Sequence, residues 1–350
     1  MEVKLKYLIL FVTVQCNSRC VMCFNYNLNA VNTNELTLEE YRKIAKNLKS
    51  ELKSLMISGG EPSLRRDLPE ICKIFYEHCN LKKIYLPLNG LDKEKTINIV
   101  EKILLLCPNI QLNAGLSVNG IGEIHDTQCG ISGSFSKVMS THEALSKLSE
   151  QFTNLKRGVI TTVTKININQ LEELVNYIYN LASRPDYHDI MVCRIQAGSK
   201  TDKELLISSD EYENVLNIAD KYLYFYSKKK YNRFFLGNIG YIHHKILNHI
   251  YLNAYKNKRI INCKAPEFIR VIEADGRVRI CELKDEVGNI RDYNYDLNKM
   301  DIDLNISSKK VNCACTHPCF VVPSLRYSSN IIKSCTSILV DNLNFQKVMR

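Results

Sequence analysis

The chain has 350 residues, of which 45% are apolar and 24% are charged, as in soluble globular proteins. This length allows one large domain and a smaller one, and no apolar run reaches the roughly 18 residues of a membrane span. The net charge is +10, but lysines are abundant throughout, so the short run 228–230 is interpreted as a solvated helix end and nucleic-acid binding is not expected.

The N-terminal apolar segment is predicted to be the first strand of the fold. Residues 7–14 follow several lysines, as in a signal peptide, but no small-residue cleavage site comes next and the segment runs directly into a cysteine motif. We therefore expect a cytoplasmic protein, in which fourteen cysteines indicate metal binding rather than disulfides.

Predicted strands and helices alternate as far as about residue 228. Capping boxes at Thr37–Glu40 and Ser208–Glu211 mark the starts of helices. Such β–α units predict an α/β fold, a partial (β/α)6 TIM-like barrel over residues 1–228, followed by a smaller cysteine-rich domain over 229–350. The expected strands are 6–15, 54–59, 82–89, 110–118, 157–164 and 189–196. In 112–119 apolar and polar residues alternate, which places Asn113 and Ser117 on the inner face.

Three cysteines follow the first predicted strand, at Cys16, Cys20 and Cys23. A structural zinc site needs four protein ligands, usually supplied as two Cys-x-x-Cys pairs. Three close thiolates suit an iron–sulfur cluster in which one iron has no protein ligand. That iron would be open to a small chelating molecule. Zinc stays the alternative on spacing alone.

A second motif, 58–62, reads Ser-Gly-Gly-Glu-Pro at the end of the second predicted strand. Glycines at a strand end let the backbone approach a ligand closely. Together, the Cys-x3-Cys-x2-Cys motif and this Gly-Gly-Glu-Pro motif resemble those of radical S-adenosylmethionine (SAM) enzymes. Thr13 and Asn17, on either side of Cys16, also match common residues of that family.

The resemblance implies a cofactor site and a partial-barrel core. In that family the three cysteines hold a [4Fe–4S] cluster whose fourth iron binds the amino and carboxylate groups of SAM, and the Gly-Gly-Glu-Pro backbone bonds the SAM amino group. Asn89-Gly90 and Ser117 stand where such enzymes often contact SAM, and Arg194 shares a strand face with Gln196. The cofactor-binding candidates are Gly59, Gly60, Glu61, Pro62, Asn89, Ser117 and Arg194.

Cys129 departs from the family pattern. The run 124–130, followed by Gly133-Ser134-Phe135, resembles a family segment in which an arginine usually stands at the position of Cys129. The contact made by that arginine is therefore not expected, and Cys129 is either a reactive thiol or a passive replacement. Other core-domain cysteines, at 72, 79, 107 and 193, are interpreted as small buried apolar residues.

The C-terminal cysteines predict a second metal site. Asp275-Gly276 is a hairpin signal between 268–272 and 277–280, and a hairpin brings cysteines near its two ends together. Cys263, twelve residues, Gly276, four residues and Cys281 resemble the start of the SPASM and twitch extensions of radical SAM enzymes. The resemblance implies one auxiliary [4Fe–4S] cluster, held by Cys263, Cys281 and two of Cys313, Cys315 and Cys319. Structural zinc is the alternative, and Cys335 has no assigned role.

The predicted function is a radical SAM oxidoreductase. Reductive cleavage of SAM to a 5′-deoxyadenosyl radical would be followed by hydrogen abstraction from a small polar metabolite, and Glu282, after Cys281, is a candidate base. Flavodoxin or ferredoxin is the expected electron donor. The alternatives are an enzyme that modifies ribosomally made peptides or RNA, and a non-catalytic zinc-stabilised binding protein.

Overall fold

The computed structural model describes residues 5–25, 34–48, 52–194, 202–230 and 234–327. The chain divides into two compact units, residues 1–206 with 266–309 and residues 207–265 with 310–350. It leaves the first unit after residue 206 and returns to it at residue 266. The predicted domains, 1–228 and 229–350, differ from these units mainly in residues 266–309, and that division stays a prediction.

Within the described residues, the first unit contains one nine-stranded sheet with the order β6-β5-β4-β3-β2-β1-β7-β8-β9. From β1 to β6, consecutive strands are neighbours in the sheet and pair in parallel, as expected of β–α units. The order ends at β6 and β9, so the sheet is not closed. The predicted α/β class with a parallel partial barrel is confirmed. Its strands are β1 (Tyr7–Phe11), β2 (Ser54–Ser58), β3 (Lys83–Leu88), β4 (Gln111–Ser117), β5 (Leu155–Val163) and β6 (Tyr187–Val192).

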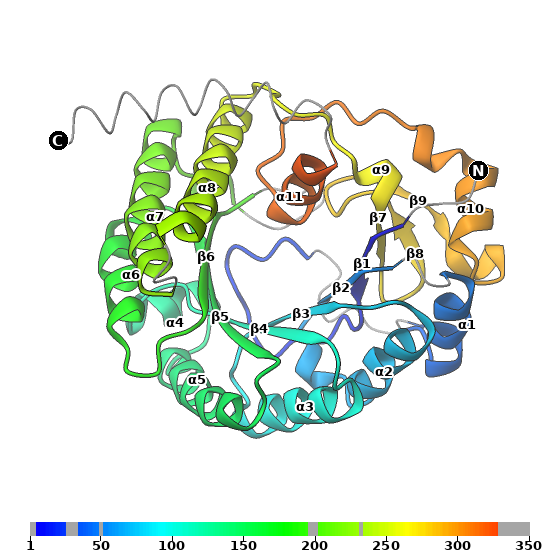
Figure 1. Ribbon diagram of the computed structural model, residues 1–350, viewed down its shortest axis with the longest axis horizontal. Coiled ribbons are helices and arrows are strands. Elements are labelled where there is room, and N and C mark those ends of the chain that lie inside the picture. The colour runs from blue at the N-terminus through cyan, green and yellow to red at the C-terminus, as the bar shows by residue number, and fades with distance from the viewer. Residues whose placement is uncertain (1–4, 26–33, 49–51, 195–201, 231–233, 328–350) are drawn as a thin grey trace. The chain divides into compact units, whose positions relative to one another are not determined.

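Helices connect these strands and cover the outer side of the sheet (Figure 1). The predicted capping box of the first helix is present, because Thr37 N donates to Glu40 Oε2 at 2.8 Å. That helix buries one face, which includes Tyr41 and Ile44. The helices are α1 (Leu38–Leu48), α2 (Leu68–His78), α3 (Lys93–Leu106), α4 (Glu123–Cys129), α5 (Ser134–Gln151) and α6 (Leu171–Asn180).

The predicted inner row of β4 contains a close contact that requires glycine. Gly115 pairs with Gly158 of β5, which pairs with Tyr187 of β6. A Cβ atom on Gly158 would lie 2.0 Å from the Tyr187 ring, so no larger residue fits beneath it. Asn113 of the same row is buried and accepts a hydrogen bond from Gln111 Nε2 at 2.8 Å. The side chains of one strand thus limit which residues fit at the paired positions of its neighbours.

Three further strands extend the sheet beyond β1. The predicted hairpin around Asp275-Gly276 is confirmed as β7 (Ile269–Ile272) and β8 (Arg277–Arg279), followed by β9 (Glu286–Asn289). Strand β7 pairs in parallel with β1. Since β8 runs antiparallel to β7, the turn after β8 lies at the edge of the sheet where β1 begins. The loop after β1 lies at the opposite edge.

A buried ion pair holds this extension. Arg270 of β7 is 1% exposed and bonds Asp301 of α10 (Leu297–Leu304). Its guanidinium also donates to the carbonyl oxygens of Pro266 and Ile269, at 2.7 and 2.6 Å. Because the charge is desolvated, its stability in the core depends on the carboxylate partner.

The second unit is helical where the structure describes it. It contains α7 (Ser209–Lys230), α8 (Phe234–Tyr255) and α11 (Pro318–Arg326). A packed core between α8 and α11 comprises Ile246, Leu247, Ile250, Val321 and Leu325. Asp220 of α7 accepts a hydrogen bond from Asn248 of α8 at 2.6 Å, which ties the two long helices together. Taken over both units, the described helices include none that is long and apolar enough to cross a membrane.

We expect Asp301→Ala to destabilise the first unit by about 3–5 kcal/mol, because it leaves the buried Arg270 guanidinium without its charge partner. Urea-induced unfolding followed by circular dichroism measures this loss. Asp303→Ala, an exposed change in the same helix, is the control and should shift stability by less than about 0.5 kcal/mol. Equal effects of the two substitutions would contradict the prediction.

Candidate metal and cofactor site

The loop after β1 carries three half-buried thiols. None of Cys16, Cys20 and Cys23 is in a disulfide, and all three are partly exposed. The thiol of Cys16 is close enough to the other two for their charges to raise its pKa. The predicted trio is therefore a local cluster at the carboxyl edge of the sheet.

Backbone N–H groups point at these sulfurs. Ser18 N donates to Cys16 Sγ at 3.4 Å, and the backbone of Asn25 bonds the Cys23 sulfur. Cys79, interpreted from the sequence as a core residue, instead donates its thiol to Ala45 O at 3.7 Å. Sulfur that accepts hydrogen bonds is favoured as thiolate, the form that binds metal. The cysteine loop thus has the donor chemistry that an iron–sulfur cluster requires.

The three thiols differ in acidity. Burial raises the pKa of Cys16 to about 11 and also raises the pKa of Cys23. A hydrogen bond from Cys129 outweighs burial at Cys20 and lowers its pKa to about 7. Cys20 is therefore the thiol of the trio that ionises most readily before any metal binds.

The Gly-Gly-Glu segment runs directly against the chain before Cys16. Gly60 N donates to Thr13 O and Glu61 N to Gln15 O, each at 2.7 Å. A Cβ atom on Gly59 would lie 2.4 Å from Thr13 O, and one on Gly60 would lie 2.0 Å from Gln15 O. Both glycines are thus required by this close approach, which fixes where the cysteine loop starts.

Glu61 and Asn89 connect the predicted motifs. Glu61 is 2% exposed, and its Oε2 accepts a hydrogen bond from Asn89 N at 2.8 Å. Asn89 Nδ2 then donates to Asn17 Oδ1 at 2.7 Å. The other Glu61 oxygen accepts from the Ser63 hydroxyl at 2.5 Å. One buried carboxylate thereby links the ends of β2 and β3 to the cysteine loop.

Two residues that the sequence reasoning missed also hold the loop. Glu35 Oε1 accepts hydrogen bonds from Thr13 Oγ1 and Val14 N, at 2.8 and 2.9 Å. Arg65 Nη1 donates to Val12 O at 2.6 Å and forms an ion pair with Asp67. Neither residue belongs to a spaced motif. The only local signal is the position of Arg65 three residues after Pro62.

The remaining cofactor candidates stand at the ends of strands. Pro62, buried, begins the short 3-10 helix after Glu61. Ser117 ends β4, and Arg194 follows β6. Carboxyl ends of parallel strands share one edge of a sheet, so both lie at the edge of the cysteine loop. Gln196, expected beside Arg194, lies outside the described residues.

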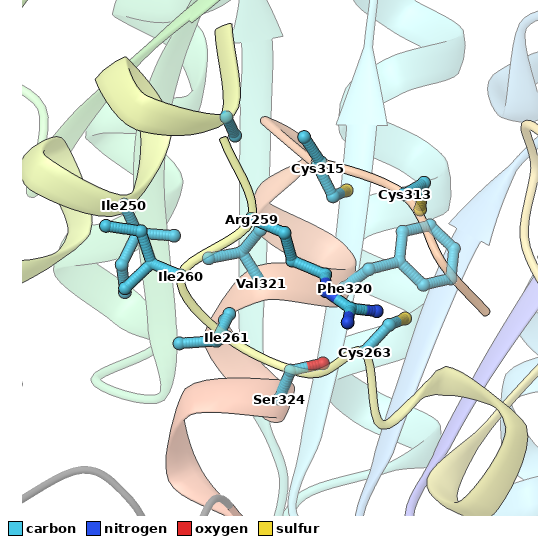
Figure 2. Close-up of a pocket in the computed structure, with 12 residues that line it drawn as sticks. Ile250, Arg259, Ile260, Ile261, Cys263, Cys313, Cys315, Phe320, Val321 and Ser324 are labelled. Atoms are coloured by element: carbon cyan, nitrogen blue, oxygen red, sulfur yellow. The ribbon is translucent and has the colours of Figure 1, made fainter. Parts of the chain in front are cut away.

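Three of the C-terminal cysteines line one pocket of the second unit (Figure 2). Cys263 comes from the segment after α8, and Cys313 and Cys315 from the segment before α11. His317 N donates to Cys315 Sγ at 3.3 Å, the same i+2 pattern as in the first loop. The free space is about 20 Å³, little more than one water molecule. A larger group would therefore spread these segments.

Cys281 and Glu282 belong to the first unit, in the turn after β8. Leu283 N lies 3.5 Å from Cys281 Sγ, again as donor from position i+2. Both residues are buried, and their turn lies at the opposite edge of the sheet from Cys16. Cys319 lies in the first turn of α11, beside its N-cap His317. Cys335 lies outside the described residues.

Among the described residues, no three His, Cys, Asp or Glu side chains are grouped to hold a metal ion. In a four-iron cluster each thiolate binds a different iron, so the sulfurs stand further apart than the ligands of one ion. A cluster therefore does not require its cysteine ligands to be as close together as the ligands of a single metal ion. The choice of ligands among the eight candidate cysteines stays a prediction.

Known proteins resemble this chain in sequence. Residues 10–178 match the family model of the radical SAM superfamily. The chain is 27% identical over 222 residues to an uncharacterized protein, MJ0907, of Methanocaldococcus jannaschii, which covers 62% of this chain and 72% of that protein. It is 27% identical over 170 residues to Fe-coproporphyrin III synthase of Methanosarcina barkeri, covering 48% of this chain and 39% of the synthase. The match to this synthase, whose activity is named, thus covers well under half of the length of the synthase.

Solved structures share the fold. SuiB of Streptococcus suis bound to SAM aligns with a TM-score of 0.59 at 15% identity, covering 87% of this chain and 68% of SuiB. Bound to its precursor peptide SuiA, SuiB aligns with a TM-score of 0.60 at 14% identity, covering 90% and 71%. These neighbours show a shared fold, and the match to the radical SAM family model covers just under half of the chain.

We expect Gly60→Ala to lower the iron content of the anaerobically reconstituted protein several-fold, because the new Cβ would displace Gln15 and the cysteine loop behind it. Iron and sulfide analysis measures the loss. Gly133→Ala is the control: its Cβ meets open space, and it costs only the left-handed backbone strain of about 1–2 kcal/mol. Full iron content in Gly60→Ala would refute the proposed role of the close approach.

Proposed function

We propose that this protein is a radical SAM oxidoreductase that binds a [4Fe–4S] cluster through Cys16, Cys20 and Cys23. The observation that carries the proposal is the cysteine loop itself. Its three thiols share one loop, two of their sulfurs accept backbone hydrogen bonds, and the glycine pair fixes its position. The donor set provides three thiolates, which leaves one iron for SAM.

When bound, the cluster and SAM would supply reductive cleavage to a 5′-deoxyadenosyl radical that takes hydrogen from the substrate. The role of the protein would be to position the cluster and SAM. Glu61 and Asn89 keep the loop against β2 and β3. Ser117 and Arg194 are the proposed contacts for the nucleotide, because their strands end at the same edge.

We also propose an auxiliary [4Fe–4S] cluster in a SPASM- or twitch-like extension. The convergence of Cys263, Cys313 and Cys315 on one pocket supports it. The i+2 hydrogen bonds to Cys315 and Cys281 add support, because they match those of the first loop. As in the prediction from the sequence, the four ligands would be Cys263, Cys281 and two of Cys313, Cys315 and Cys319. The cluster would accept an electron from the substrate or orient it, with flavodoxin or ferredoxin as the donor for the first cluster.

A small polar metabolite is the proposed substrate, and Glu282 is the proposed base. A peptide is the second candidate, because SuiB, which shares the fold, is known bound to its precursor peptide. The two are distinguished by whether a deproteinised extract of the source organism or its peptide fraction stimulates 5′-deoxyadenosine formation.

Cys20→Ala should abolish 5′-deoxyadenosine formation from SAM under dithionite, because it removes a ligand of the SAM-binding cluster. Liquid chromatography of the quenched reaction measures the product. Cys72→Ala, which removes a buried thiol of α2, should leave cleavage near the wild-type rate. Unchanged cleavage in Cys20→Ala, or one zinc per chain with no iron in the wild-type protein, would refute the proposed function.

Cys281→Ala should lower iron content while leaving SAM cleavage uncoupled from the substrate, because it affects only the auxiliary cluster. Iron analysis and product formation are measured on the same sample. Wild-type iron content in this variant would remove Cys281 from the ligand set without affecting the assignment of the first cluster.

A further inference from the structure

Cys129, the residue that departs from the family pattern, contacts the cysteine loop. It ends α4, is 4% exposed, and forms a side-chain hydrogen bond with Cys20. Ser18 bridges the same two residues, since its Oγ lies 3.1 Å from Cys20 Sγ and donates to Cys129 O at 3.0 Å. Arg19 N also donates to Cys129 O, at 2.9 Å. The end of α4 and the loop are thus joined by several hydrogen bonds.

His125 lies one helical turn before Cys129, on the same face of α4. Its Nδ1 accepts a hydrogen bond from Asn119 N at 3.0 Å, and a backbone N–H can only donate. In a neutral ring the proton is therefore on Nε2, which lies 3.4 Å from Cys129 Sγ. Burial lowers the pKa of His125 to about 4, so the ring is neutral near pH 7. His125 is thus a donor to the Cys129 sulfur.

The thiol proton of Cys129 then points away from His125. Asn119 Nδ2 is a second donor, 4.0 Å from Cys129 Sγ. Cys20 and Ser134 also bond the Cys129 sulfur, and the hydroxyl of Ser134 already donates its proton to Asp126 Oδ1 at 2.8 Å, which leaves only its lone pairs for the thiol. A metal-bound thiolate is charged and accepts more strongly than a neutral hydroxyl. With a cluster bound, Cys20 is therefore the favoured acceptor.

We propose that Asn119, His125 and Cys129 form a directed hydrogen-bond chain whose last donor, the Cys129 thiol, bonds the Cys20 thiolate and raises the reduction potential of the cluster. This inference rests on the proposed function. Cys129 and His125 are positioning residues in this proposal, since neither contacts the substrate.

The sign of the effect follows from charge. Reduction adds an electron that is shared with the thiolate sulfurs, so a donor to sulfur stabilises the reduced cluster more than the oxidised one. The buried surroundings strengthen the interaction, because water does not compete for it. Asn119 is itself held in place: its Oδ1 accepts from Thr162 N at 2.8 Å and its carbonyl from Asn167 Nδ2 at 2.7 Å.

The test is a potentiometric titration of the anaerobically reconstituted full chain, followed by electron paramagnetic resonance without SAM. Cys129→Ala should make the one-electron reduction about tenfold less favourable, a midpoint shift of about −59 mV. Cys129→Val, which also lacks a donor but fills the space, should shift it in the same direction. Cys129→Ser keeps a donor and should stay near the wild-type potential.

Two controls separate this proposal from a structural effect and from the proposed function. Cys79→Ala removes a buried thiol that bonds Ala45 instead, and should leave the potential unchanged. Wild-type potentials in both Cys129→Ala and Cys129→Val, with full cluster content, overturn the hydrogen-bond chain and leave the proposed function intact. A wild-type protein that binds no cluster overturns both.

Discussion

Close packing between residues 13–15 and 59–61 is the constraint on which the candidate site depends. Two backbone hydrogen bonds of 2.7 Å join these segments at a point where neither Gly59 nor Gly60 has room for a Cβ atom. The loop with Cys16 therefore starts from a position set by main-chain geometry. Three partly or fully buried side chains hold these segments. Glu35 accepts a hydrogen bond from Thr13 Oγ1, and Arg65 donates one to Val12 O. Glu61 accepts one from Asn89 N.

The direction of hydrogen bonding to sulfur distinguishes four of the predicted ligands from Cys79. Four predicted ligands, Cys16, Cys23, Cys281 and Cys315, accept from the backbone two residues further on. Cys79 donates to a carbonyl. Hydrogen bonds to an accepting sulfur favour the thiolate and so oppose the burial that raises the pKa of Cys16 and Cys23, whereas a donating sulfur is a thiol. This distinction depends on local backbone conformation, so spacing alone does not predict it.

The sequence was sufficient for the α/β class, the six parallel strands, the hairpin at Asp275-Gly276 and the cysteine loop, because each has a local periodicity or spacing. It did not predict that β7 pairs with β1, which depends on contacts between residues over 250 positions apart. Nor did it predict the bonds from Glu61 through Asn89 to Asn17. Cys129 was noticed only as a departure, since it comes into contact with His125 and Cys20 only after α4 folds against the loop.

The direction of β8 has a consequence for electron transfer within the first unit. Cys281 lies at the edge of the sheet where β1 begins, whereas Cys16 follows the end of β1, and the five residues of that strand span about 17 Å. A redox centre that includes Cys281 would therefore have this ligand at the edge of the sheet opposite to the cysteine loop. An electron passing between such centres would have to cross from one edge of the sheet to the other.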